Sequence, residues 1–237
     1  GENHSAGHPF RFGVWAEGEF SWVHGDDWQR KLDYQTDSLV TSVTLSCEWQ
    51  QIELHCNDTI DFHENVYLKQ IKVKNCSNSA RRVRLFFGQD FHISDYELGD
   101  TAAYYPQMNA VIHYKGDRYF LVNGLKEDGS GISDYATGYK EMPGAEGTWR
   151  DCEDGALGKG PISQGSVDSA IGIHLHMNAG DESTVYYWIC CGTNYHEVSL
   201  LDRLVRTKGP QKMIERTDSY WRTPGSDACG SRSSSAA

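Results

Sequence analysis

The stretch "RRVRLFFGQDFHI", residues 81–93, decides the fold class of this chain. Its odd positions carry apolar side chains, namely Val83, Leu85, Phe87, Phe91 and Ile93. Its even positions include Arg82, Arg84, Asp90 and His92. A period of two places all the apolar side chains on one face of an extended backbone. The stretch therefore predicts a long, half-buried β-strand.

The same period recurs along most of the chain. It is present in "SLVTSVTLSCEW" (38–49), "QIELHC" (51–56) and "AIGIHLHM" (170–177), whereas "YFLVNG" (119–124) and "TVYYWICCG" (184–192) are apolar on both faces. Segments rich in glycine and acidic residues separate these runs and are typical of turns. Many strands at such spacing indicate a sandwich or a barrel. We predict an all-β fold of two large antiparallel sheets packed face to face.

Two segments depart from this period. Residues 125–166 are rich in Gly, Asp and Glu, which predicts a long excursion with one short strand. From Asn194 the pattern becomes helical, with Glu197 three residues after this capping residue. The first helix has an apolar stripe of Val198, Leu201, Leu204 and Val205. A second helix starts at Pro210 and is expected to bury Met213, Ile214, Thr217, Tyr220 and Trp221. We predict a sandwich over 1–193, a helical linker over 194–222 and a disordered tail over 223–237.

Composition excludes several classes of function. The net charge of −11 argues against nucleic acid and anionic membranes as partners, because both need basic surface. No apolar run approaches the roughly 20 residues of a membrane helix. The polar start, Gly1-Glu2-Asn3-His4, shows no signal peptide, which favours the cytoplasm without fixing the compartment. The seven cysteines are scattered without a C-x-x-C pair, which predicts neither a zinc ribbon nor a disulfide framework.

The stretch "DFHENVYL", residues 61–68, holds Asp61, His63 and Glu64 just before an apolar run. An acid, an imidazole and a carboxylate so close together suggest acid–base or metal chemistry. In an extended backbone, however, His63 and Glu64 point to opposite faces. Polar side chains at the start of a strand also commonly bond backbone groups that have no other partner. We therefore interpret this stretch as architecture.

Two further clusters are candidates for chemistry. His174 and His176 share one strand face and, with Glu182 beyond the next turn, have the residue types of a metal site. We interpret the two histidines as a solvated strand face next to a Gly-Asp turn, and we predict no metal and no cofactor. In "TWRDCEDG" (148–155), Trp149 can stack on a sugar ring while Arg150, Asp151 and Glu153 bind its hydroxyls. Three acids in a loop are also typical of a solvated turn.

A resemblance rests on long blocks in a fixed order. They are "ENHSAGHPFRFGVWAEGEFSW" (2–22), "DFHENVYL" (61–68), "LFFGQDFHI" (85–93), "GDTAAYYP" (99–106), "VIHYKGDRYFLVNG" (111–124), "GAEGTWRDCEDG" (144–155) and "QGSVDSAI" (164–171). From about residue 2 to Trp221 the chain resembles the amino-terminal β-sandwich domain of bacterial and archaeal glucoamylase-like proteins. These proteins form glycoside hydrolase family 15, which includes glucodextranase-like and trehalase-like branches.

The resemblance implies a β-supersandwich, a helical linker and a following (α/α)6 barrel that holds two catalytic glutamates. The likeness ends at Thr223, so those glutamates have no counterpart here and the barrel is expected to be a missing partner domain. Members of the family usually begin with one or two strands before the segment that matches "ENHSAGHPF". We therefore expect an exposed sheet edge that can pair with a second copy of the chain in a homo-oligomer.

Three functions follow from the sequence. The first is a sandwich domain of a family 15 α-glucoside hydrolase, inactive alone, which supports the barrel or contacts carbohydrate. The second is a stand-alone supersandwich enzyme, similar to an epimerase or a lyase, for which the catalytic candidates are Asp90, His92, His113 and Tyr114. The third is a free carbohydrate-binding module that uses Trp149. An α-glucoside is the expected ligand in the first and third cases.

Overall fold

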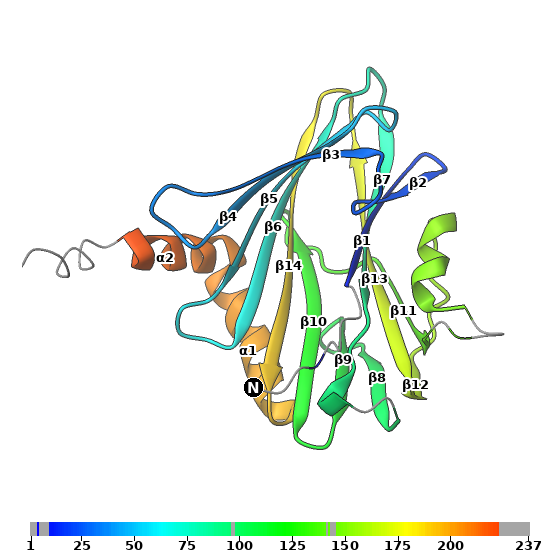
Figure 1. Cartoon of the computed structure of the whole chain (residues 1–237), viewed down its shortest axis with the longest axis vertical. Helices are drawn as coiled ribbons and strands as arrows, with labels where there is room; N and C mark the ends of the chain where they lie inside the picture. Colours follow the sequence, from blue (N-terminus) through cyan, green and yellow to red (C-terminus); the bar gives the residue numbers. More distant parts are fainter. Residues whose placement is uncertain (1–3, 5–9, 96–97, 141, 143–145, 223–237) are drawn as a thin grey trace, which may run out of the picture.

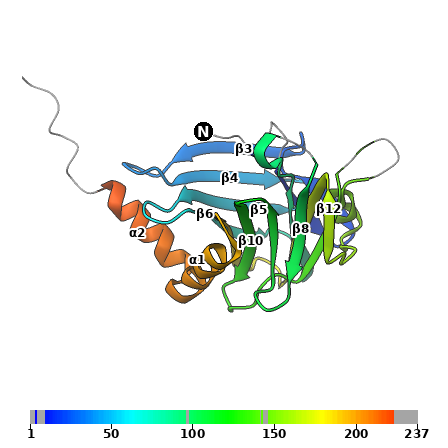
Figure 2. The ribbon, with the colours of Figure 1, turned by 90° about the horizontal axis from the view of Figure 1, so that it is seen from below.

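The computed structural model describes residues 4, 10–95, 98–140, 142 and 146–222. The described strands form two antiparallel sheets that pack face to face, as predicted (Figure 1). One sheet has nine strands in the order β12-β8-β9-β10-β14-β6-β5-β4-β3, and the other has five in the order β11-β13-β7-β1-β2. Figure 2 shows the two sheets from below, with the helices beside the larger one.

The nine-stranded sheet is built largely from consecutive hairpins. Its strands are β3 (Trp28–Tyr34), β4 (Thr41–Cys47), β5 (Ile52–Ile60), β6 (Val66–Asn75), β8 (Asp100–Tyr105), β9 (Ala110–Lys115), β10 (Arg118–Lys126), β12 (Ile162–Gly165) and β14 (Glu182–Gly192). The long strand β14 lies between β6 and β10 and joins the two halves of the sheet.

The five-stranded sheet brings together distant parts of the sequence. Its strands are β1 (Arg11–Ala16), β2 (Glu19–Trp22), β7 (Arg81–Gln89), β11 (Asp134–Tyr139) and β13 (Val167–Met177). β7 lies between β1 and β13, so the alternating stretch "RRVRLFFGQ" (81–89) forms the centre of this sheet. Val83, Leu85 and Phe87 are all buried, which agrees with the predicted inward face.

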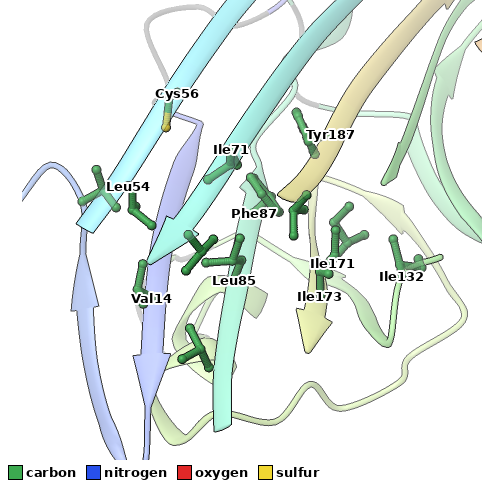
Figure 3. Close-up of a cluster of buried hydrophobic side chains, with 14 of the residues drawn as sticks. Val14, Leu54, Cys56, Ile71, Leu85, Phe87, Ile132, Ile171, Ile173 and Tyr187 are labelled. Carbon is green, nitrogen blue, oxygen red and sulfur yellow. The ribbon is translucent and has the colours of Figure 1, made fainter. Parts of the chain in front are cut away.

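The main core fills the space between the two sheets. Leu54, Cys56 and Ile71 from the larger sheet belong to one buried cluster with Leu85 and Ile171 from the smaller one (Figure 3). Each of these side chains is fully buried. This packing explains why strands with a period of two dominate the sequence, since one face of each strand is removed from water.

Two helices cover the outer face of the nine-stranded sheet. They are α1 (Tyr195–Lys208) and α2 (Pro210–Arg222), and their apolar side chains join a second core with Leu68, Ile112 and Trp188. The predicted cap is confirmed, because Asn194 Oδ1 accepts from the backbone N–H of Glu197 at 3.0 Å. Asp202, on α1, is buried and accepts hydrogen bonds from Asn123 at 2.9 Å and Trp188 at 3.0 Å. The helices are thereby fixed to the sheet.

A short 3₁₀ helix, η2 (Thr148–Asp154), covers the outer face of the five-stranded sheet. The contact is close at its end, where Gly155 has a positive φ of 85°. A Cβ atom there would lie 2.6 Å from Trp15 Nε1, so only glycine fits. Arg84 also donates to the carbonyl oxygen of Gly155.

Several local predictions need correction. The strand predicted over 81–93 ends at Gln89, and the chain then turns through the 3₁₀ helix η1 (Ile93–Asp95), where Ser94 has a φ of 60°. Residues 125–166 contain η2 and two strands, β11 and β12, instead of one strand. Tyr220 and Trp221 were expected to be buried, but they are 53% and 44% exposed. The predicted tail at 223–237 lies outside the described residues.

The sheet edges are the strands β3, β12, β11 and β2. The edge strand β3 is exposed over most of its length and carries Arg30, Lys31 and Asp33, charges that discourage pairing with other strands. The predicted homo-oligomer stays a prediction. Among the described residues, no helix has both the length and the apolar character needed to cross a bilayer.

Candidate functional site

The "DFHENVYL" stretch spans the turn between β5 and β6 and the first residues of β6, and it anchors helix α2. The Asp61 carboxylate accepts from the backbone N–H groups of His63 and Glu64 at 3.0 and 2.9 Å. It also binds Arg216 of α2 through Nε at 3.1 Å and Nη2 at 2.8 Å. The Asp61 side chain has no exposed surface. All these partners belong to the protein itself, so the geometry favours architecture over acid–base chemistry.

The four catalytic candidates are not assembled into one site. His113 lies between the sheets, where its ring is 4.9 Å from that of Phe91. Tyr114 is the next residue on β9, so it points to the opposite face, where its ring stacks on Tyr119 at 5.1 Å. An extended strand cannot turn both side chains toward one substrate. Tyr114 is therefore separated from His113 by the sheet itself.

Asp90 and His92 follow the end of β7 and are nearly buried. Asp90 forms an ion pair with Lys140 at 2.7 Å, and Lys140 also donates to the carbonyl oxygen of Phe91 at 2.6 Å. These bonds tie the chain after β7 to the segment after β11. The catalytic roles assigned to Asp90 and His92 remain predictions.

His113 begins a buried chain of hydrogen bonds. Its Nε2 lies 2.7 Å from Ser169 Oγ, which donates to Gln89 Oε1 at 3.0 Å. Gln89 Nε2 in turn donates to the Tyr187 hydroxyl at 3.2 Å. Because Ser169 uses its proton toward Gln89, it accepts from His113, which is therefore protonated on Nε2. Burial, assisted by the nearby Lys140 charge, lowers the pKa of His113 to about 3, so this ring is neutral.

Trp149 lies in η2, and the guanidinium groups of two arginines lie over its ring. The guanidinium carbon of Arg11 is 4.2 Å from the ring centroid, and that of Arg150 is 4.4 Å away. Trp22 meets the same ring edge-on at 5.7 Å. These contacts pin the loop to the five-stranded sheet. A sugar could stack on Trp149 only after one arginine moved, so this use of the loop stays a prediction.

The other residues predicted to contact sugar differ in their surroundings. Arg150 and Glu153 are 3.9 Å apart and both lie near the surface. Asp151 is exposed, although partial desolvation raises its pKa. The buried acid beneath the loop is Asp168, which accepts from the Thr148 N–H at 3.0 Å and from its hydroxyl at 2.9 Å. Desolvation raises the pKa of Asp168 to about 6.

The three residues considered for metal binding do share one hollow. His174, His176 and Glu182 line a surface pocket of about 490 Å³ together with Lys126 and Asp128. In the part of the chain that the structure describes, no three His, Cys, Asp or Glu side chains are grouped as metal ligands. The prediction of no metal was made from sequence and has no direct test here.

A cleft between the two sheets was missed by sequence reasoning. It has a volume of about 380 Å³ and is lined by Phe10, Arg11, Phe12, Tyr67, Lys69, Phe87, Gly88, Tyr187 and Ile189. The sequence held one signal for it. In "VYLKQIKV", the phase of the inward residues Ile71 and Val73 also includes Tyr67 and Lys69, and a lysine in a core phase is unusual.

Comparison with known proteins gives a match in structure and none in sequence. No protein-family model matches the chain, and no curated protein matches it. A crystal structure of bacterial glucoamylase complexed with acarbose superposes with a TM-score of 0.70 at 14% identity, over 90% of this chain. The chain has the β-sandwich fold of that glucoamylase's amino-terminal region. The predicted fold is thereby confirmed.

The match covers only part of the glucoamylase chain. The glucoamylase-like region corresponds to 31% of the glucoamylase chain, so this chain spans about a third of that protein's length. A family GH92 alpha-mannosidase from Bacteroides thetaiotaomicron, in complex with mannoimidazole, also matches at 10% identity, over 86% of this chain and 24% of its own. Its TM-score of 0.29 is too low to support an argument. The glucoamylase match establishes the fold and leaves the function to be proposed.

Proposed function

We propose that this chain is the non-catalytic sandwich domain of an α-glucoside hydrolase and that it serves as a rigid base for a catalytic domain. The single observation that carries the proposal is an exposed aromatic surface at the end of α2. It consists of Phe62, Tyr220 and Trp221 and is called the α2 aromatic patch. These residues are between 40% and 53% exposed.

The α2 aromatic patch is preorganised. The rings of Phe62 and Tyr220 stack at 4.4 Å with an interplanar angle of 11°. Trp221 meets Tyr220 edge-on at 5.1 Å, and Arg216 lies over the ring of Phe62 at 5.3 Å. Aromatic side chains and arginine are enriched in protein interfaces, and neighbouring exposed aromatic rings mark contact sites. The patch therefore suits a protein partner with an apolar face.

The catalytic domain is the occupant that the comparison favours. The glucoamylase that shares this fold has about two thirds of its chain outside the matched region. The resemblance in sequence implies that an (α/α)6 barrel follows the helical linker, and α2 is the second helix of that predicted linker. A barrel connected after Arg222 would start beside the patch. In this arrangement Asp61 and Arg216 hold the helix that presents the docking surface.

The test begins with the longest protein that the gene encodes. Hydroxyl-radical footprinting is expected to label Phe62, Tyr220 and Trp221 in the 237-residue chain and to leave them protected in the longer protein. A Phe62→Ser/Tyr220→Ser double variant of the longer protein should separate the melting transitions of its two domains. Leu200→Ser is the matched control, because Leu200 is 49% exposed on α1 and lies outside the patch.

Two results would contradict the proposal. One is equal labelling of the patch in the short chain and in the longer protein. The other is release of glucose from maltose, trehalose or dextran by the 237-residue chain itself, above a heat-killed control and lost in a Glu64→Gln or Glu153→Gln variant. The second result would favour a stand-alone enzyme.

A further inference from the structure

The cleft between the sheets has the residue composition of a small-molecule site. Phe12 of β1 stacks on Phe87 of β7 at 4.9 Å with an interplanar angle of 3°. Phe87 in turn stacks on Tyr187 of β14 at 4.4 Å and 14°. One wall therefore consists of an aromatic ladder that runs from one sheet to the other. The volume of about 380 Å³ falls within the usual range of ligand pockets.

The polar groups of the cleft are held by a half-buried network of hydrogen bonds. The Asp58 carboxylate accepts from the Tyr67 hydroxyl, from Lys69 Nζ at 2.7 Å and from Thr41 Oγ1 at 3.1 Å. The Lys69 and Asp58 side chains are only 18% and 15% exposed. Lys69 Nζ also lies 5.9 Å from the centre of the Phe12 ring. The ammonium group is thus fixed beside the aromatic wall, with its charge balanced by Asp58.

Two residues that line the cleft have hydrogen-bonding capacity left over. An ammonium group has three N–H donors, and Lys69 uses one of them toward a described residue. The Tyr187 hydroxyl accepts from Gln89 and has no acceptor for its own proton within the described ranges. Burial raises the pKa of Tyr187 above its usual range, so the hydroxyl keeps this proton. Both groups belong to residues that line the cleft.

We propose that this cleft binds a single neutral sugar ring. The C–H face of a pyranose packs well on aromatic side chains, and its hydroxyls both donate and accept. The cleft offers donors from Lys69 and Tyr187, which both line it. Asp58 balances the charge of Lys69, and the guanidinium of Arg11, the other cation of the lining, lies over the Trp149 ring, so the polar groups of the cleft suit a neutral ligand. This site lies between the sheets and is independent of the α2 aromatic patch.

The site also differs from the loop around Trp149. The Trp149 ring is covered by Arg11 and Arg150 on the outer side of the five-stranded sheet. Tyr187, in contrast, belongs to the core cluster between the sheets. Substitutions at the two places can therefore distinguish the two sites. Loss of docking at the patch would not affect the cleft, so its test is separate from that of the proposed function.

The experiment is a titration of the 237-residue chain with glucose, followed by saturation-transfer NMR and calorimetry. A ligand of this size is expected to bind with a Kd on the order of a millimolar. Tyr187→Phe keeps the stacked ring and removes the hydroxyl, which should weaken binding about three- to tenfold. Lys69→Met should weaken it by a similar factor. Glucuronate, which adds a charge, should bind no more tightly than glucose.

Tyr119→Phe is the matched control, because Tyr119 lies on the outer face of the same sheet and packs in the second core. Its glucose affinity should equal that of the wild type. Melting temperatures of all variants would show that each is folded. The inference is overturned if glucose gives no saturable binding, or if Tyr187→Phe and Lys69→Met bind like Tyr119→Phe. Loss of binding in Trp149→Phe alone would assign the sugar to the loop instead.

Discussion

Replacement of Asp61 by alanine is expected to destabilise the protein through the loss of one buried carboxylate. Asp61 has no exposed side-chain surface and receives bonds from Arg216 and from the backbone N–H groups of His63 and Glu64. A bidentate, charge-assisted pair contributes about 2 kcal/mol, and the loss of a cap-like acceptor for backbone N–H groups costs about 1 kcal/mol. The Arg216 side chain is 28% exposed and can partly return to water, which keeps the cost below that of a fully buried pair.

The expected loss is therefore about 3 kcal/mol in the free energy of unfolding, or about 6–12 °C in Tm for a domain of this size. Urea unfolding followed by circular dichroism measures the first quantity, and a thermal scan measures the second. A double-mutant cycle with Arg216→Met should show a coupling of about 1.5–2 kcal/mol, because each single change removes the same ion pair. Asp218→Ala is the control, since its pair with Arg222 lies at the surface and is expected to contribute less than about 1 kcal/mol.

Two outcomes would refute this reasoning. One is an Asp61→Ala variant as stable as Asp218→Ala. The other is strict additivity in the cycle with Arg216→Met, which would mean that the pair seen in the structure stores no free energy. Either result would reopen a functional role for the "DFHENVYL" stretch.

Three further predictions concern other parts of the sandwich. Asp202→Ala should cost about 3 kcal/mol in unfolding free energy, measured in urea, because Trp188 and two other donors lose their buried acceptor. His113→Gln should make the stability of the protein less sensitive to acid. The pKa of His113 is about 3 in the folded protein and near 6.5 in the unfolded chain, so the wild type loses stability as the pH falls through this window. The stability advantage of the wild type over His113→Gln should shrink by about 1.4 kcal/mol per pH unit there, measured by urea unfolding across this pH range. Trp149→Ala should release the η2 loop and lower the free energy of unfolding by about 2 kcal/mol. The release should be measurable as faster proteolysis between residues 146 and 160. An unchanged rate of proteolysis would mean that the ring makes no net contribution to stability.

The predictable part of the fold is the part fixed by the burial of one strand face. Val83, Leu85 and Phe87 alternate with charged residues, and each lies in the core as the period requires. The cap at Asn194 is equally local, because the acceptor and the N–H of Glu197 are three residues apart. Signals of this kind need no knowledge of distant contacts.

The errors arise where distant segments decide the structure. The strand at 81–93 stops at Gln89 although its alternation continues, because Asp90 pairs with Lys140, which lies 50 residues further along the chain. Tyr220 and Trp221 have helical spacing with the buried Met213 and Thr217, yet they lie at the surface, where Tyr220 stacks on Phe62. Local pattern alone cannot show where a supporting surface ends.

The candidate functional sites were also hard to predict, because local sequence pattern does not show which distant residues meet. The catalytic hypothesis joined Asp90 and His92 with His113 and Tyr114 because they fall on two neighbouring strand-like segments of the sequence. In the structure β7 and β9 belong to different sheets, and His113 and Tyr114 face opposite sides of β9. The cleft joins Phe12, Lys69 and Tyr187, which come from three strands in two sheets and share no motif. In a sandwich, residues that meet in space are usually far apart in sequence. A site between the sheets is therefore the kind that sequence motifs miss, and the inward-facing Lys69, which interrupts an apolar phase on β6, is the trace that such a site leaves in the sequence.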